Sequence, residues 1–179
     1  MVSYLKRTWV SRKLRPGESG IHGEGVFAAA PIRAGELVMD FGGELVTADV
    51  LGDYREPSAW AVKGGLYLAL RNTDTEHSLD EYLNHSCDAN TWLAGETKLV
   101  ARRDIAPGEE ITLDQGTWNF DDAEYADDGT TCTCGAVSCR GVLTENDWRR
   151  TDVQERYRGH FHPLVQALID AGSSTMHTV

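Results

Sequence analysis

Short runs of alternating apolar and polar residues, separated by glycine and proline, dominate this chain. Alternation over about four to eight residues is typical of half-buried β-strands. Strands are therefore expected within 2–10, 26–28, 37–41, 97–103 and 110–114. The glycine and proline residues clustered at 15–25 predict a loop.

Two further patterns indicate tight turns between strands. Gly64-Gly65 separates the apolar runs 60–62 and 66–70, and a glycine pair in this position is typical of a β-hairpin. Segments 32–38 and 105–111 have the same sequence pattern, in which an apolar residue is followed by a Gly-Glu turn and then by a second apolar residue. We interpret them as two strand–turn–strand units of the same design.

Helical signals are few and lie mainly toward the C-terminal end. Thr47 precedes a short helix expected at 48–51, and Thr144 with Asp147 resembles a capped helix start. A short amphipathic helix is expected within 162–171, where apolar residues recur at helical spacing. The acidic, strand-poor stretch 119–131 is expected to be a linker.

Composition narrows the class of protein. A chain of 179 residues, 41% of them apolar, suits one domain with a core, with or without a small appendage. It has neither an apolar run long enough to span a membrane nor an N-terminal apolar signal, so we expect a soluble, cytoplasmic protein without a membrane partner.

The charge of the chain favours a basic partner. The net charge of −11 argues against direct nucleic-acid binding and favours a partner rich in lysine and arginine. The acidic positions within 121–128 are suited to attracting such a segment. Solubility alone would also explain the overall charge, and a solvated linker would explain the acidic stretch.

Chemically active side chains gather in the run Asn84-His85-Ser86-Cys87-Asp88-Ala89-Asn90. The Asn84 amide both donates and accepts hydrogen bonds, and the His85 ring nitrogens change roles with protonation. Together they are suited to recognising a purine edge. The alternative is a polar pair that satisfies the backbone of its own loop.

The cysteines follow a metal-binding pattern. Cys132, Cys134 and Cys139 lie within eight residues, and Gly135 permits a tight turn between them. Structural zinc requires four ligands, which Cys87 completes if the tail folds back onto residues 84–90. Three cysteines unrelated to the fourth are the alternative, whereas the scattered tail histidines His160, His162 and His177 are not expected to be ligands.

The glycine loop Gly23-Glu24-Gly25 offers backbone groups to a small anionic or zwitterionic ligand, although a simple turn explains this feature better when it is taken alone. Five segments together carry a family pattern: His22-Gly23-Glu24-Gly25-Val26-Phe27, Phe41-Gly42-Gly43-Glu44, Tyr82-Leu83-Asn84-His85-Ser86-Cys87-Asp88-Ala89-Asn90, Gly108-Glu109-Glu110-Ile111-Thr112-Leu113-Asp114 and 132–141. They resemble the SET-domain family of protein-lysine methyltransferases with a post-SET zinc knuckle. The resemblance covers about 20–148, and Ala89 stands where the family usually has proline.

The resemblance implies a mainly β fold, the β-clip SET fold, in which several small sheets surround a knot-like crossing. Short helices and a C-terminal helical tail complete this fold. It divides the chain into a SET domain (1–120), a post-SET zinc-binding segment (121–150) and the tail (151–179).

The resemblance also implies S-adenosylmethionine-dependent methylation of lysine in a basic protein or peptide. The residues expected to contact S-adenosylmethionine are His22, Gly23, Glu24 and Gly25, with Asn84 and His85 at its adenine end and Trp60 nearby. Zn²⁺ would be held by Cys87, Cys132, Cys134 and Cys139. Trp118 and Phe120 are candidates to line the lysine channel.

The catalytic positions depart from the family pattern. Gln115 stands where a tyrosine usually orients the lysine amine, and Phe41 replaces a second tyrosine. An amide oxygen still accepts a hydrogen bond from an amine. Candidates for a substitute hydroxyl are Tyr82, together with Tyr54, Tyr67 and Tyr125. Three interpretations stay open: an active methyltransferase, a cofactor-binding protein that recognises a basic peptide without turnover, and a zinc-stabilised interaction domain.

Overall fold

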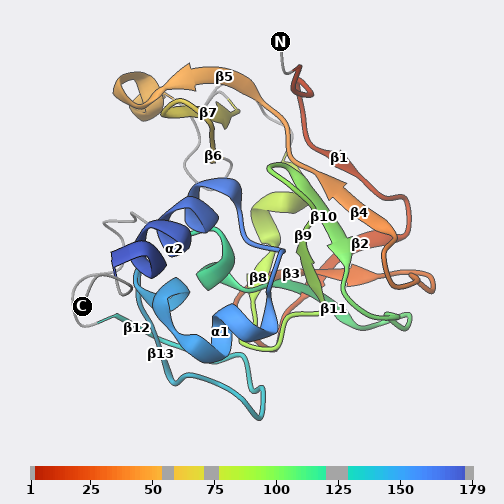
Figure 1. Cartoon of the computed structure of the whole chain (residues 1–179). Coiled ribbons are helices and arrows are strands. Elements are labelled where there is room, and N and C mark those ends of the chain that lie inside the picture. The colour runs from red at the N-terminus through yellow and green to blue at the C-terminus, as the bar shows by residue number, and fades with distance from the viewer. Residues whose placement is uncertain (1–2, 54–58, 71–76, 120–128, 176–179) are drawn as a thin grey trace.

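The computed structural model describes residues 3–53, 59–70, 77–119 and 129–175 (Figure 1). The strands are β1 (Trp9–Val10), β2 (Leu14–Glu18), β3 (Glu24–Ala28), β4 (Leu37–Asp40), β5 (Glu44–Thr47), β6 (Trp60–Val62), β7 (Leu66–Ala69), β8 (Asn84–His85), β9 (Thr91–Leu93), β10 (Lys98–Ala101), β11 (Glu110–Leu113), β12 (Thr130–Thr131) and β13 (Val142–Leu143). The helices are the 3-10 turns η1 (Ala48–Asp53), η3 (Leu79–Tyr82), η4 (Gln115–Thr117) and η5 (Asp147–Arg149), and the α-helices α1 (Thr151–Arg156) and α2 (Pro163–Thr175).

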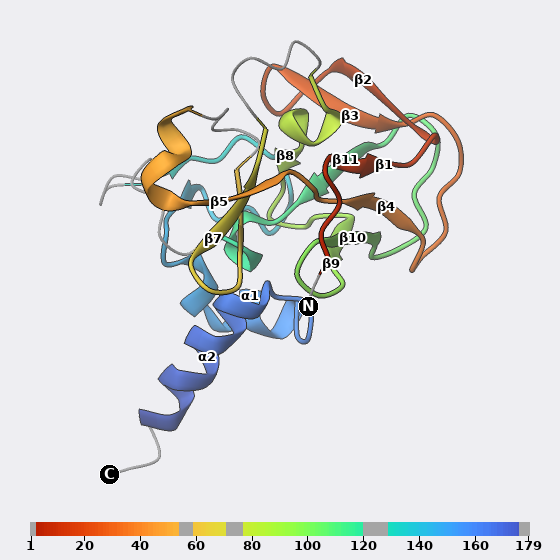
Figure 2. The same cartoon turned by 90° about the horizontal axis from the view of Figure 1, so that it is seen from above.

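The strands form four small sheets, in the orders β1-β4-β10-β9, β2-β3-β11-β8, β5-β7-β6 and β12-β13. All the pairs are antiparallel except β8 with β11, which run parallel. The expected mainly β fold of several small sheets is confirmed (Figures 1 and 2).

The main core draws apolar side chains from the first two sheets and from the β6–β7 hairpin. Val26, Met39, Leu99 and Ile111 within it are fully buried. The two Gly-Glu turn units meet through an antiparallel bridge between Ile32 and Ile105, so their shared design places them side by side.

Several local predictions are confirmed. The β6–β7 hairpin turns at Gly64 and Gly65, whose φ angles of 81° and 70° are in the left-handed region that glycine adopts without strain. A short helix follows Thr47, and the C-terminal amphipathic helix forms as α2. The proposed linker at 119–131 lies largely outside the described residues.

Two predictions at the N-terminal end hold only in part. The strand expected within 2–10 is reduced to Trp9–Val10, and part of the loop expected at 15–25 is strand β2. β2 accommodates Pro16 because it lies at the edge of its sheet, where a missing N–H breaks no ladder. At position 17 glycine avoids crowding, because the Cβ of any larger residue would lie only 3.0 Å from the Phe27 ring.

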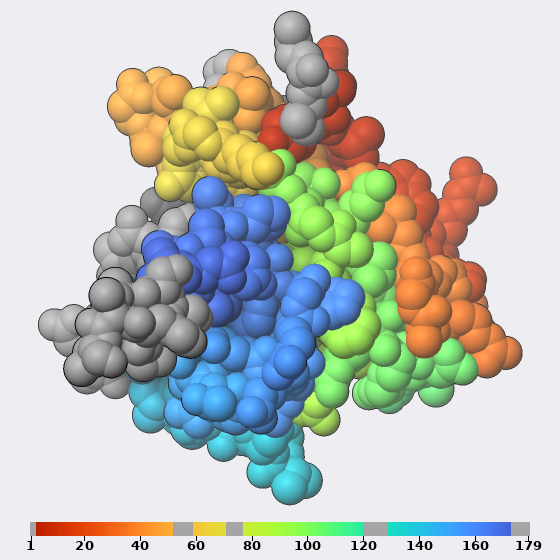
Figure 3. Space-filling view, viewed as in Figure 1, coloured from red at the N-terminus to blue at the C-terminus, as the bar shows by residue number. Residues whose placement is uncertain are grey.

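The C-terminal helices pack onto the middle of the chain. Val153, Tyr157 and Val165 form a second apolar cluster that includes Ala89 and contacts Trp92. In the space-filling view the blue C-terminal segment lies directly against the green middle of the chain (Figure 3). No helix among the described residues is both long and apolar enough to cross a bilayer.

Candidate functional site

Strand β8 places the Asn84-His85 pair at the centre of the molecule. It pairs in parallel with β11, so that Asn84 lies beside Thr112 and His85 beside Leu113. Asn90 reinforces this placement, because its Nδ2 donates to the Glu110 carbonyl at 2.7 Å. The polar run is thus fixed against the second sheet rather than lying in a free loop.

The Asn84 amide joins this strand to the glycine loop. Its Nδ2 lies 3.1 Å from the His22 carbonyl, 2.9 Å from the Glu24 carbonyl and 2.8 Å from Glu110 Oε1. An amide nitrogen has only two hydrogens, so these three acceptors share them. Asn84 and loop 22–25, predicted to act together, do lie together.

Glu110 takes part in this junction, although sequence reasoning gave it no role. Its carboxylate accepts from the Ser19 hydroxyl at 2.8 and 2.9 Å. A Cβ on Gly25 would lie 2.3 Å from Glu110 Oε1, so only glycine leaves room for this carboxylate. The available signal was its place in the motif 108–114.

His85 is buried and neutral. Burial lowers its pKa to about 4, although the nearby Asp114 carboxylate opposes the shift. The Gln115 backbone N–H donates to Nδ1 at 3.1 Å, so the neutral ring carries its hydrogen on Nε2. Nε2 lies 3.3 Å from Cys87 Sγ and donates to it.

Three of the four cysteines predicted as ligands lie close together, with His85 beside them. Cys87 Sγ lies 3.8 Å from Cys132 Sγ, and the donor atoms of His85, Cys87, Cys132 and Cys134 all lie within 4.8 Å of one another. Tetrahedral thiolates at about 2.3 Å from zinc are separated by about 3.8 Å. This cluster therefore fits a metal ion.

Cys139 lies beside the same thiols. Its Sγ lies 3.9 Å from the Cys132 carbonyl and donates to it. The backbone N–H of Gly141 donates to this Sγ at 3.4 Å. Five donor side chains are thus available for an ion that takes four ligands.

The thiols differ in acidity. Burial raises the pKa of Cys87 to about 11. Burial also acts to raise the pKa of Cys134, but hydrogen bonds from the backbone N–H groups of Cys87 and Ala136 outweigh it and lower the pKa to about 7. Because a metal binds thiolates, ion binding here releases protons.

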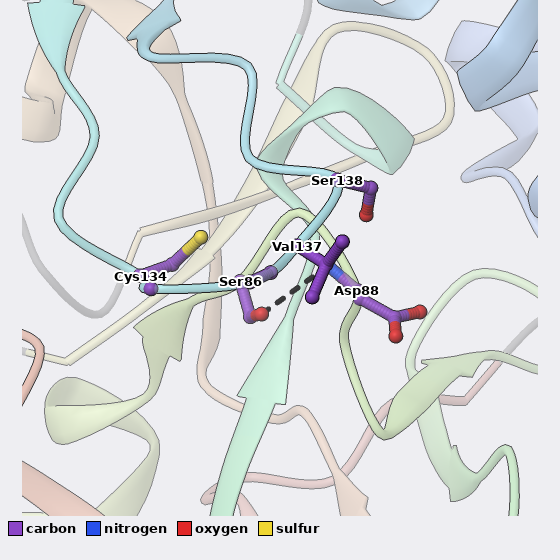
Figure 4. Close-up of a pocket in the computed structure, with 7 residues that line it drawn as sticks. Ser86, Asp88, Cys134, Val137 and Ser138 are labelled. Atoms are coloured by element: carbon purple, nitrogen blue, oxygen red, sulfur yellow. Dashed lines mark hydrogen bonds between the residues drawn. The ribbon is translucent and has the colours of Figure 1, made fainter.

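A hollow of about 520 Å³ lies beside Cys134 (Figure 4). Ser86 and Asp88 form one wall, with a 3.2 Å hydrogen bond from the Asp88 N–H to Ser86 Oγ, and residues 134–138 form the other. It lies on the knuckle side of Cys134. Its lining contains none of the residues predicted to hold the cofactor.

The cysteine-bearing tail also closes over the glycine loop. The Thr133 hydroxyl, between two cysteines, donates to the Ile21 carbonyl at 3.0 Å. From helix α1, Arg156 donates to the Cys87 carbonyl and the Tyr157 hydroxyl accepts from the Ala89 N–H at 3.1 Å. Residues 84–90 are therefore enclosed by β11, the knuckle and the tail.

Comparison with known proteins agrees with this arrangement. The SET domain family model matches residues 23–116, which is more than half of the chain. The chain belongs to the SET-domain family. Its observed β fold of small sheets is consistent with that family.

Relatives of this SET domain carry histone-lysine N-methyltransferase names. ATX2 of Arabidopsis thaliana is 31% identical over 86% of this chain and 14% of its own length. SETD1 of Drosophila melanogaster is 32% identical over 74% of this chain and 8% of its own. A histone-lysine N-methyltransferase of Cryptococcus neoformans, named as H3 lysine-4 specific, is 36% identical over 74% of this chain and 10% of its own length. The chain thus spans a small part of these relatives.

Three aromatic residues of this SET domain, Phe41, Trp60 and Trp118, lie in ring contact with one another. Phe41 stacks on Trp60 with ring centres 4.1 Å apart, and Trp118 lies 5.2 Å from Trp60. The Trp60 indole N–H donates to the Glu96 carbonyl at 2.8 Å, which fixes the ring. The structure thus brings the predicted cofactor-side and channel aromatics together, while Phe120 lies outside the described residues.

His162 is an addition to this cluster that sequence reasoning missed. Its ring meets the Trp60 ring edge-on at 5.7 Å, and burial lowers its pKa to about 4. The Leu164 N–H donates to its Nδ1 at 3.3 Å. A tail histidine carries no sequence signal for such a place, because only the docking of α2 brings it there.

Gln115, at the usual tyrosine position, lies on turn η4. Its Oε1 is buried and finds no hydrogen-bond partner among the residues that the structure describes. Tyr82 lies on η3, where it packs against the main core with its ring 6.1 Å from that of His77. Tyr67 packs in a separate small cluster, and Tyr54 and Tyr125 lie outside the described residues. The roles of Gln115, Phe41 and Tyr82 stay predictions.

Proposed function

We propose that this SET domain is an S-adenosylmethionine-dependent protein-lysine N-methyltransferase that acts on a basic protein segment. One observation carries the proposal: Asn84 ties the glycine loop to His85 beneath a knuckle that closes over the same loop. The names of the relatives, all histone-lysine N-methyltransferases, support lysine as the acceptor.

The residues present fit the cofactor. Gly23 has a φ of 49° and open space where a Cβ would stand, so a ligand can approach its backbone closely. His22, Glu24 and Gly25 offer further backbone groups, while Asn84 and His85 flank them. When bound, S-adenosylmethionine supplies an electrophilic methyl group for transfer to an amine.

The chain's own residues position the acceptor. The buried Gln115 Oε1 is an acceptor for one N–H of a neutral lysine amine, which directs the nitrogen lone pair away from it. Phe41, Trp60 and Trp118 exclude water around the amine and favour its uncharged form. Catalysis is then largely orientation, with the amine proton leaving to solvent before transfer.

The charge of the protein supports a basic substrate. A net charge of −11 attracts lysine- and arginine-rich segments and speeds their encounter with the site. We also propose a cytoplasmic location, because all four cysteines are unpaired thiols, as is usual in a reducing compartment.

We propose zinc as the metal, held by Cys87, Cys132, Cys134 and Cys139. His85 is the competing fourth ligand by distance. Coordination through Nε2 would require the hydrogen on Nδ1, where the Gln115 N–H already donates. His85 is therefore better suited to donate from Nε2 to the Cys87 thiolate, which leaves the fourth position to Cys139.

The decisive experiment is transfer of a labelled methyl group to a lysine-rich histone-tail peptide, with the same peptide carrying arginine at each lysine as control. We expect label only on the lysine peptide. A purified, folded protein that binds S-adenosylhomocysteine and transfers no label would contradict enzyme activity.

The second candidate is a protein that binds cofactor and peptide without turnover, and Gln115 in place of the tyrosine hydroxyl favours it. The Gln115→Tyr variant separates the two. Activity that arises only in this variant supports the binding protein, whereas activity in the natural chain supports the enzyme.

A further inference from the structure

The guanidinium of Arg140, one residue after Cys139, is buried between two carboxylates. Its side chain is 1% exposed. Nη1 and Nη2 donate to the two Asp114 oxygens at 2.8 and 2.7 Å, and Nε lies 2.8 Å from Asp147 Oδ2. A two-pronged arginine–carboxylate pair fixes orientation as well as distance, which a lysine does not do.

Asp114 transmits this orientation to the turn that carries Gln115. Its fully buried carboxylate caps η4 by accepting the Gly116 N–H at 2.9 Å, and its carbonyl accepts the Thr117 hydroxyl at 2.7 Å. The position of the Arg140 guanidinium therefore sets the position of the Asp114 cap. The cap in turn sets the backbone of Gln115.

A second series of hydrogen bonds joins Gln115 to the cysteine cluster. The Gln115 N–H donates to His85 Nδ1, and His85 Nε2 donates to Cys87 Sγ. The Arg140 backbone N–H donates to the same sulfur at 3.4 Å. Cys87, His85, Gln115, Asp114 and Arg140 thus form a cyclic network that joins the metal cluster to the proposed amine-binding turn.

The network is buried, and burial makes its bonds interdependent. The side chains of His85, Asp114 and Arg140 are 7%, 0% and 1% exposed. In such surroundings hydrogen bonds strengthen one another, and a carboxylate that loses its partner is strongly destabilised. Solvent cannot replace these buried hydrogen bonds, so a displacement of the Cys87 sulfur also displaces the Gln115 backbone.

We infer that Arg140 is a positioning residue that couples metal binding at the cysteine cluster to the geometry of the Gln115 turn. Metal binding fixes Cys87 and the knuckle that bears Arg140, and Arg140 then fixes the Asp114–Thr117 backbone. If a ligand binds only when this turn is ordered, its binding raises the affinity for the metal. By linkage, the bound metal raises the affinity for that ligand by the same factor. The second half of this inference rests on the proposed function.

Amide hydrogen exchange tests the first half without any cofactor. In the zinc-loaded protein the Gly116 and Gln115 amides report on the network, and the Ile105 amide, bonded to the Ile32 carbonyl at 2.9 Å, reports on the distant core. We expect Arg140→Lys to speed exchange at Gly116 and Gln115 at least about 10-fold, and Arg140→Met more, with Ile105 unchanged and one zinc still bound.

Two matched variants serve as controls. Asp147→Asn removes the other carboxylate of Arg140 but leaves the cyclic network whole, so exchange at Gly116 should change less than about 3-fold. Arg103→Lys alters a surface pair with Glu109 and should change nothing. Unchanged Gly116 exchange in zinc-loaded Arg140→Met, or equal acceleration at Ile105, would overturn the inference.

Zinc release to a chromogenic chelator tests the second half. We expect saturating S-adenosylhomocysteine to slow release from the natural protein at least about 5-fold, and less than about 2-fold from Arg140→Lys. Equal slowing in both proteins, or none in a natural protein that calorimetry shows to be loaded, would contradict the coupling. Failure of S-adenosylhomocysteine to bind at all would instead contradict the proposed function and leave the exchange experiment decisive for Arg140.

Discussion

The backbone N–H of Gln115 donates a hydrogen bond to Nδ1 of His85 across 3.1 Å, although the two residues are thirty positions apart. This bond decides which ring nitrogen of His85 carries hydrogen, and so makes Nε2 a donor toward Cys87 Sγ. It also joins the amine-binding candidate to the metal cluster.

Loss of one thiol should abolish stable metal binding. Cys139→Ser leaves three thiols, and structural zinc requires four good ligands, so zinc content should fall from one per chain to near zero after dialysis. Metal analysis measures this directly. Ser138→Ala, at the half-buried neighbouring position, is the matched control and should keep its zinc. Full zinc content in Cys139→Ser would instead favour His85 as the fourth ligand.

Removal of the Asn84 amide should weaken cofactor binding. Asn84→Ala removes the donor shared by the His22 and Glu24 carbonyls and the Glu110 carboxylate. The loss of hydrogen bonding to a charged group costs about 1.5–3 kcal/mol, which corresponds to a roughly 10- to 100-fold rise in the Kd for S-adenosylhomocysteine. Titration calorimetry tests this, with Asn146→Ala at an exposed site as control. Equal affinities for Asn84→Ala and the natural protein would argue against this site.

Substitution of Gln115 should act on turnover more than on cofactor affinity. Gln115→Ala removes the Oε1 acceptor but keeps the backbone N–H that donates to His85. We expect kcat to fall about 10- to 100-fold, as for the loss of one positioning hydrogen bond, with little change in the Kd for S-adenosylhomocysteine. Gln115→Glu is the matched variant, because it keeps an acceptor oxygen at nearly the same volume. Undiminished kcat in Gln115→Ala would assign amine positioning to another residue.

Stability should decline in mild acid, in part through His162. Burial lowers its pKa to about 4 in the folded protein, whereas an unfolded histidine has a pKa of about 6.5. The unfolded chain therefore binds the extra proton first as the pH falls. This contribution is full above about pH 6.5 and is lost progressively down to about pH 4, to a limit of about 3 kcal/mol.

Urea unfolding of the zinc-loaded protein at pH 7 and pH 5 measures this difference. His162→Phe should show a smaller loss of unfolding free energy between the two pH values than the natural protein, whatever its absolute stability. His77→Phe, at an exposed position, should show the natural loss. If His162→Phe loses as much stability as the natural protein, its ring is not the buried base inferred here.

The sequence alone determined much of the site, because its chemistry is local. The Asn-His-Ser-Cys run and the three clustered cysteines identify donors by type and spacing, and Cys132 and Cys134 do lie beside Cys87. The Gly64-Gly65 turn was also predictable from the sequence, because positive φ angles restrict which residues fit there. Strand β2 was not predictable from the sequence, because Pro16 is tolerated only through the pairing of β2 with β3 at a sheet edge.

The tertiary structure decided everything that depends on segments distant in the chain. Glu110 joins Asn84 only through the parallel β8–β11 pairing, and Arg140 meets Asp114 only when the knuckle folds back. His162 reaches Trp60 only because α2 packs against the body. Sequence patterns report what a residue is able to bond, whereas burial and closure decide which partner is there, because a buried polar group is stable only beside the group that satisfies it.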